Sequence, residues 1–291
     1  QIGFQALLDW LWPEVLEKSW SIWLVSFVPL YLVAVPVGLL LFRLVPRAPI
    51  PQSRPKIRYM LATIPICMFL MYAGNVVGIA VTLLSQLVLD ITSVNPLFDL
   101  VTGSSIWLRL GIMVVLAPMI EELIFRRSII DRIRIYGEKR AVVLSALLFG
   151  LFHGNFSQFF YAFALGLAFG FVYLRTGRLR YTICLHMLIN FMGGILAPEL
   201  LTLVDLEALE TMESLDALLQ PGMLVLLAYG ALIANLAIFG LVMLCVHSRK
   251  IRFATAPLEL PRGVRFKTAY LNPGMILAFL LLIAAMVYSL G

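Results

Sequence analysis

The sequence predicts an all-α membrane protein, a polytopic bundle of about eight transmembrane helices. Hydrophobic residues make up 62% of the 291 residues and charged residues only 13%, whereas a soluble domain is nearer half apolar and a quarter charged. The apolar residues also come in blocks of about twenty, the length of a membrane-spanning helix. A single integral membrane domain over residues 1–291 is therefore expected, embedded as a multi-pass protein in the lipid bilayer of the cell membrane.

Eight hydrophobic blocks define the predicted spans. Prolines inside the first two blocks are compatible with membrane helices, because neighbouring helices can satisfy the freed backbone groups. The fourth and fifth blocks adjoin at Asn155–Gln158, and residues 1–20, with three tryptophans, are expected to lie along the interface. The spans comprise residues 21–43, 59–89, 106–130, 140–158, 159–175, 180–197, 221–246 and 273–290.

Charge predicts the orientation of these spans. All but two of the 22 lysines and arginines fall on one side if eight spans alternate. The opposite side receives Asp90, Asp99 and the acidic loop Glu199–Asp216. By the positive-inside rule, the basic loops are cytoplasmic and both termini lie on the other side. The basic balance thus indicates contact with anionic lipid headgroups, not with nucleic acid. The four basic segments are Arg43–Arg58, Arg126–Arg140, Arg175–Arg180 and Arg249–Lys267.

Ionisable side chains inside membrane spans are rare, and they are as a rule either paired or functional. The third span carries the adjacent carboxylates Glu121 and Glu122. Glu122 precedes Arg126 by four residues, so these two side chains lie on one helix face and neutralise each other. Glu121 points about 100° away from that face and has no cation within its own helix.

The fourth span adds His153, and the sixth adds His186 and Asn190, which are four residues apart on one face. Each alone has a structural explanation, as a hydrogen-bonded core histidine or an asparagine that joins two helices. Together with Glu121 they are typical of a hydrolytic site, with a base, a partner for it and donors for a developing oxyanion. No serine or cysteine lies beside a base, which disfavours a nucleophilic triad.

These residues form three motifs in a fixed order, each within a predicted span. The set resembles the CAAX protease and bacteriocin-processing family, which includes the type II CAAX prenyl endoproteases and the bacterial Abi proteins. The resemblance covers roughly residues 115–195, the expected catalytic core. The motifs are Glu121-Glu122-x-x-x-Arg126, Phe149-x-x-x-His153 and His186-x-x-x-Asn190.

The resemblance implies an intramembrane glutamate-dependent endopeptidase that needs no cofactor. Glu121 would be the general base that activates water, assisted by His153, while His186 and Asn190 would form the oxyanion hole. Three further residues would support the site. The substrates would be membrane-associated or lipidated proteins, or leader-bearing peptides. The supporting residues are Glu122, Arg126 and Phe149.

Two alternatives stay open at the level of sequence. Glu121, His153 and His186 could supply a set of zinc ligands, although the chain has no HExxH motif. Glutamate and histidine inside spans also suit a proton-coupled carrier, or a non-catalytic immunity or scaffold protein. Carriers commonly contain two related halves, and no such repeat is visible. The concentration of polar residues in three spans favours a single reaction centre.

Overall fold

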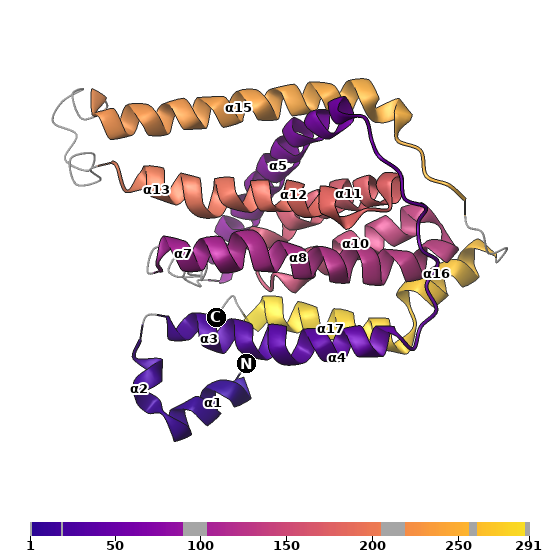
Figure 1. Ribbon diagram of the computed structural model, residues 1–291, viewed down its shortest axis with the longest axis horizontal. Coiled ribbons are helices and arrows are strands. Elements are labelled where there is room, and N and C mark those ends of the chain that lie inside the picture. The colour runs from indigo at the N-terminus through magenta and orange to yellow at the C-terminus, as the bar shows by residue number, and fades with distance from the viewer. Residues whose placement is uncertain (1, 19, 90–103, 205–218, 256–260, 289–291) are drawn as a thin grey trace.

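The computed structural model describes residues 2–18, 20–89, 104–204, 219–255 and 261–288, and these ranges are all-α (Figure 1). Two short helices at the N-terminus lead into a continuous helical segment of three parts, and the 33-residue α5 follows. Asp90 and Asp99 lie outside the described residues, as does most of the acidic loop. These first elements are α1 (Ile2–Leu11), α2 (Pro13–Leu16), α3 (Ser21–Val28), η1 (Pro29–Ala34), α4 (Val35–Phe42) and α5 (Ile57–Leu89).

The segment that carries the two adjacent glutamates runs without a break from Ile106 to Tyr136. One π-helical stretch precedes the glutamates and another follows them. A second continuous segment, from Leu179 to Leu201, carries His186 and Asn190. The elements are α7 (Ile106–Leu108), η2 (Arg109–Leu116), α8 (Ala117–Glu122), η3 (Leu123–Ile130), α9 (Asp131–Ile133), η4 (Arg134–Tyr136), α10 (Glu138–Phe152), α11 (Phe156–Thr176), α12 (Leu179–Phe191), η5 (Met192–Leu196), α13 (Ala197–Leu201), α15 (Pro221–His247), η7 (Ser248–Lys250), α16 (Arg262–Tyr270) and α17 (Pro273–Tyr288).

The chain is an integral multi-pass membrane protein, and each of the eight predicted blocks overlaps a described helix or helical segment. The fourth block is shorter than predicted, because α10 ends at Phe152 and α11 begins at Phe156. Five of the described helices are long and apolar enough to cross a membrane, or six if the bent pair α16–α17 forms one span. Two predicted blocks do not meet these requirements of length and apolarity, each for a physical reason. α10 has only 15 residues, about 22 Å of helix, and the segment around Glu121 carries too many charges. The count of eight spans and the orientation stay predictions.

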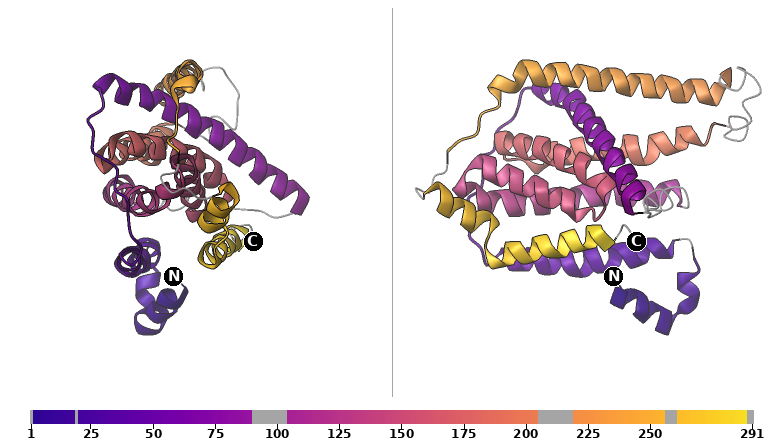
Figure 2. Two further views of the ribbon diagram at one scale, coloured as in Figure 1. Left: turned by 90° about the vertical axis from the view of Figure 1, so that its right-hand side faces the viewer. Right: turned by 180° about the vertical axis from the view of Figure 1, so that it is seen from behind.

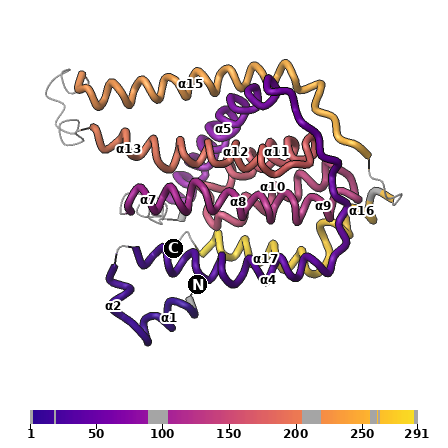
Figure 3. The backbone as a smooth tube through the Cα atoms, viewed as in Figure 1, coloured from indigo at the N-terminus to yellow at the C-terminus, as the bar shows by residue number. Residues whose placement is uncertain are grey.

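The helices form layers around a core of α10, α11 and α12 (Figures 1 and 2). α5 crosses this core diagonally and α15 packs on the outside of α5, while the first helical segment and α17 lie on the opposite side. One buried cluster joins α5 through Cys67 and Met68 to Leu165 and Phe169 of α11. The tube in Figure 3 shows how the segment from Ile106 to Tyr136 runs through the middle of these layers.

The described parts of the four basic segments gather at one end of the bundle, apart from the buried Arg126, and hydrogen bonds join these segments (Figure 1). Backbone N–H groups of Ala48 and Ser53 donate to the carbonyls of Asp131 and Thr176, at 2.8 Å each. The Glu138 carboxylate accepts from the backbone N–H of Ala254 at 2.8 Å. These bonds tie the loop before α5 and residues 251–255 to the ends of the core helices, so basic side chains gather at this end of the bundle.

Glycines allow the core helices to approach backbone to backbone. Gly166 and Gly170 of α11 face Ala146 and Val142 of α10, where an added Cβ would come within 2.9 and 3.0 Å of their atoms. The two glycines, four residues apart, thus form a small-residue packing face on α11. On the other side of α11, a Cβ on Gly74 of α5 would lie 2.3 Å from the Cα of Tyr161.

Gly74→Ala is expected to destabilise the protein by about 1–3 kcal/mol or more, since backbone atoms of α5 and α11 must separate to admit the methyl group. Thermal unfolding of the purified protein in detergent measures the loss. Gly38→Ala is the matched control, because open space surrounds Gly38, and its effect should stay within about 0.5 kcal/mol. Equal stability of the two variants would contradict the proposed close crossing.

Candidate active site

A buried ion pair lies directly beneath the candidate site. Glu122 ends α8, and its Oε2 lies 3.0 Å from Nε of Arg126, one turn later in η3, with both side chains 0% exposed. This confirms the pair predicted from their spacing. Arg126 also donates from a terminal nitrogen to Oγ of Ser145, at 3.1 Å, and its guanidinium lies 4.8 Å from the centre of the Phe149 ring. Two side chains of α10, Ser145 and Phe149, therefore hold the guanidinium of this pair in place.

His186 of α12 lies between the two adjacent glutamates. Its Nδ1 is 3.2 Å from Oε1 of Glu122, and its Nε2 is 3.7 Å from Oε2 of Glu121. A carboxylate oxygen accepts, so Nδ1 of His186 donates to Glu122 and the proton on that nitrogen is fixed. Nε2 is thereby directed at Glu121, whose side chain remains 12% exposed. Glu122 orients the imidazole, and Glu121 is the carboxylate with access to open space.

His153 follows the last turn of α10 and is also held in one orientation. Its Nδ1 lies 2.8 Å from the carbonyl oxygen of Phe149. A carbonyl can only accept, so Nδ1 carries the hydrogen and Nε2 is left as an acceptor. The Phe149 ring stands perpendicular to both imidazoles, with centres 5.0 Å from His153 and 5.6 Å from His186. Phe149 thus spaces the two histidines, which explains physically why a large flat side chain occurs one turn before His153.

Asn190 lies one turn beyond His186 on α12 and bonds across to the segment that carries the glutamates. Its Nδ2 donates to the carbonyl oxygen of Met113 in η2, at 2.8 Å. The bond assigns the amide nitrogen and oxygen, and it leaves the second N–H of Asn190 available. Asn190 therefore joins two helices and can still donate to a ligand.

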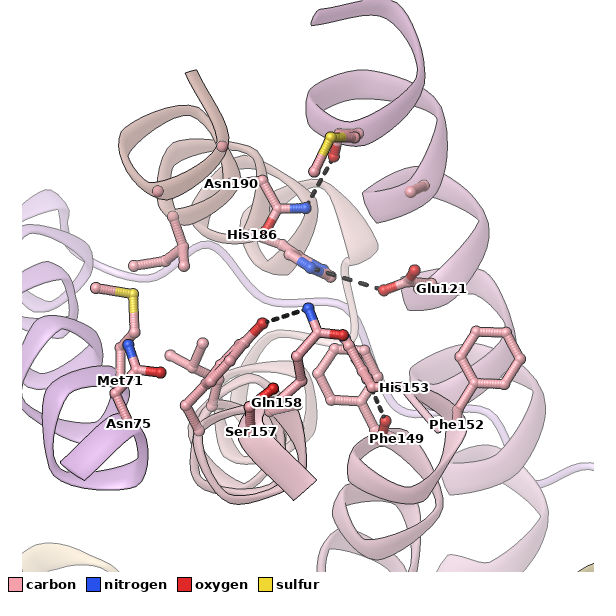
Figure 4. A pocket seen from close by; sticks show the side chains of 18 of the residues that line it. Met71, Asn75, Glu121, Phe149, Phe152, His153, Ser157, Gln158, His186 and Asn190 are labelled. Carbon is pink, nitrogen blue, oxygen red and sulfur yellow. Dashed lines mark hydrogen bonds and ion pairs between the residues drawn. The ribbon is translucent and has the colours of Figure 1, made fainter. Parts of the chain in front are cut away.

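One cavity of about 560 Å³ brings these groups together. Glu121, His153, His186 and Asn190 all line it, whereas Glu122 and Arg126 lie behind the wall. Figure 4 shows Glu121, His186 and Gln158 pointing into the same space. The rest of the lining is mostly apolar, and much of it comes from the first helical segment, α5 and α11, with Phe27, Leu30, Tyr31, Met71, Ile79 and Leu165 among its members.

Sequence reasoning missed several polar residues of this cavity. Asn75 of α5 lies on the cavity wall, one turn after Met71. Gln158 and Tyr161, near the start of α11, line the wall as well. These two residues are three apart, a spacing that places both side chains on one helix face. Tyr31 carried no such signal, because its segment meets the core only through tertiary packing.

The candidate zinc ligands do not form a coordinating group. Within the described ranges, no three histidine, cysteine, aspartate or glutamate side chains are arranged to hold a metal ion. Nδ1 of His153 and Nδ1 of His186 are both engaged with protein oxygens. The three residues are thus neighbours on a cavity wall, with their spacing set by Phe149 and Glu122.

Comparisons with known proteins point to the same segment. Residues 103–192 match the family model of the Rce1-like type II CAAX prenyl endopeptidases, and all three motifs fall within the match. A protein of Bacillus subtilis (strain 168) named "Putative membrane peptidase YdiL" is 27% identical over 118 residues, which are 40% of this chain and 43% of that protein. The match thus covers less than half of the relative's length, and no solved structure matches. The resemblance suggested by the three motifs is confirmed, because residues 103–192 are similar to the Rce1-like type II CAAX prenyl endopeptidases.

Proposed function

We propose that this protein is an intramembrane endopeptidase that hydrolyses peptide bonds with water activated by Glu121. The observation that carries the proposal is the shared cavity. Four polar residues from three helical segments line it, while their charged neighbours Glu122 and Arg126 are excluded from it. A site with a base on one side and hydrogen-bond donors on another is what hydrolysis of an acyl bond requires.

The proposed base side consists of Glu121 and His153. A water molecule between them would lose a proton to the Glu121 carboxylate while its oxygen attacks the scissile carbonyl carbon. Nε2 of His153, an acceptor by virtue of the bond to Phe149, would accept a hydrogen bond from the same water. When the tetrahedral intermediate collapses, the C–N bond breaks, and the proton held by Glu121 passes to the leaving amine. Atoms and charges balance without a further reactant.

The proposed oxyanion side consists of His186 and Asn190. Asn190 retains one free N–H, and His186 donates from Nε2 if its ring is protonated. An imidazolium would balance the charge of the cluster, because two carboxylates would then face one guanidinium and one imidazolium. In a neutral His186, Nε2 would instead present a lone pair to the Glu121 carboxylate at 3.7 Å. The charged form therefore suits both the buried cluster and the stabilisation of an oxyanion.

The apolar lining supports a membrane-associated or lipidated protein, or a leader-bearing peptide, as the substrate. We further propose that the basic end of the bundle faces the cytoplasm, in accordance with the positive-inside rule. The substrate would then be cleaved within the membrane region next to an anionic, cytoplasmic lipid surface of the cell membrane. Both termini would lie on the opposite side.

Purified protein in lipid nanodiscs provides the test. Internally quenched peptides, in matched prenylated and unprenylated forms, are expected to be cleaved by the protein and not by empty nanodiscs. A variant without the Glu121 carboxylate excludes a contaminating protease. Activity is expected to persist in a metal chelator. Absence of cleavage across the peptide set would contradict the enzymatic proposal, and loss of activity in chelator with recovery on added zinc would contradict the proposed mechanism.

A further inference from the structure

A chain of hydrogen bonds at the start of α11 has a fixed direction. It begins at the backbone N–H of Gln158, which donates to Oδ1 of Asn155 at 2.9 Å. Because a backbone N–H can only donate, Oδ1 is assigned as the acceptor and Nδ2 as the donor. Nδ2 of Asn155 then donates to the carbonyl oxygen of His153 at 2.9 Å and to Oε1 of Gln158 at 2.7 Å.

The same reasoning extends from Gln158 to Tyr161. Since Oε1 of Gln158 accepts, its Nε2 is the donor, and it donates to the hydroxyl oxygen of Tyr161 at 2.9 Å. The hydroxyl hydrogen of Tyr161 must then point elsewhere. Within the described part of the chain, no acceptor is recorded for that hydrogen, and the Tyr161 side chain lines the cavity. The chain of bonds therefore ends in an O–H donor beside open space.

Packing also fixes the position of the Tyr161 hydroxyl group. Tyr161 packs at the α5–α11 crossing, where its Cα faces Gly74 at van der Waals contact. Its ring lies 6.3 Å from the ring of His153, centre to centre. Asn155 also caps the N-terminus of α11, so the bond network and the helix start depend on the same side chain. The donor needs little reorganisation when a ligand enters.

We propose that Tyr161 donates this hydrogen to a main-chain carbonyl of the bound peptide, next to the scissile bond, with Asn155 and Gln158 as positioning residues. The inference rests on the proposed function and adds a substrate contact to it. A peptide that enters a largely apolar cavity loses the water bound to its carbonyls, so each buried carbonyl needs a donor. His186 and Asn190 are proposed to serve the scissile carbonyl, and Tyr161 can serve a neighbouring one.

Binding of an uncleaved peptide tests the contact without turnover. Glu121→Gln, which removes the proposed base, serves as the background. In this background Tyr161→Phe is expected to weaken binding of a fluorescent peptide substrate, followed by anisotropy, about fivefold, the effect of one neutral hydrogen bond. With Glu121 intact, Tyr161→Phe should raise KM by a similar factor and leave kcat within about twofold. Tyr72→Phe is the matched control, because Tyr72 lies on the exposed side of α5 and should change neither constant.

A double-mutant cycle tests Gln158 as a positioning residue of Tyr161. Gln158→Met keeps the side-chain volume and removes the bond to Tyr161, so the hydroxyl can turn and a KM increase of about two- to threefold is expected. In a Tyr161→Phe background the same substitution should have no further effect, because the two residues act through one hydrogen. A residue that only supports the fold would give additive effects and a lower melting temperature.

Three results would overturn the inference. Wild-type constants in Tyr161→Phe would exclude a contact with substrate. A loss in kcat of about 10²-fold at unchanged KM would place Tyr161 at the oxyanion instead. Additive effects with Gln158→Met would exclude the directional chain. If the wild-type protein cleaves no peptide, the proposed function fails, whereas the binding comparison in the Glu121→Gln background still decides whether Tyr161 contacts the peptide.

Discussion

Glu121→Gln is expected to reduce the rate of peptide cleavage by about 10³-fold or more. The amide has the size of the carboxylate but cannot accept the proton of water, and a general base of this kind contributes on the order of 10²–10⁴-fold to the rate. Cleavage of a quenched peptide at saturating concentration measures kcat directly. Melting temperature should change little, because Glu121 is partly exposed to the cavity and makes no bond within its own helix.

Two further variants distinguish loss of the general base from loss of a negative charge elsewhere in the protein. Glu14→Gln replaces an exposed carboxylate of α2 and should cleave at the wild-type rate. Glu122→Gln removes a carboxylate next in sequence to Glu121 but buried against Arg126, so it is expected to lower stability as well as activity. Wild-type cleavage by Glu121→Gln would contradict the assignment of the base and would favour a carrier or a non-catalytic protein.

Arg126→Met is expected to destabilise the protein by about 3–5 kcal/mol, the cost of leaving one member of a buried ion pair without its partner. Glu122 is fully buried, and its remaining polar neighbours include His186. The Ser145 hydroxyl would also lose the donor that contacts it. Thermal and denaturant unfolding in one detergent measure the loss, and activity should fall in parallel with the folded fraction.

A second substitution tests the cause of that loss. In the double variant Glu122→Gln/Arg126→Met no buried charge is left uncompensated, so most of the lost stability should return. Activity should stay low, because Nδ1 of His186 would no longer face a carboxylate. Stability in the double variant as low as in Arg126→Met alone would indicate that packing of the guanidinium on Phe149, and not charge, dominates.

Features that depend on one helix could be predicted from the sequence. The Glu122–Arg126 pair follows from a spacing of one turn, and the structure bears it out. The break between the fourth and fifth blocks was expected near Asn155–Gln158, and α11 begins at Phe156 with Asn155 as its cap. In each case a local rule of helix geometry or capping decides the outcome, and no knowledge of neighbouring helices is needed.

Features that depend on how helices pack could not be predicted. The place of His186 between two glutamates of another segment is set by the approach of α12 to α8. Asn75 and Tyr31 enter the cavity because α5 and the first helical segment happen to border it. The ion pair between Arg109 and Glu199 joins η2 to α13, 90 residues apart in sequence. Polarity marks such residues as unusual, but only tertiary structure assigns their partners.

The close crossing of α5 and α11 has a consequence for how the cavity can adapt. Near Tyr161 the wall rests on a contact between two backbones, which leaves no side-chain volume that could yield. The facing wall contains Phe27, Leu30 and Tyr31 of the first helical segment. This segment meets the core through side chains, around Val35 and Ala117 and again at Phe42. One side of the cavity is therefore stiff and the other compliant. Tolerance for bulkier peptides is expected to arise through displacement or shortening of side chains in the first helical segment, outside residues 103–192, which match the family model.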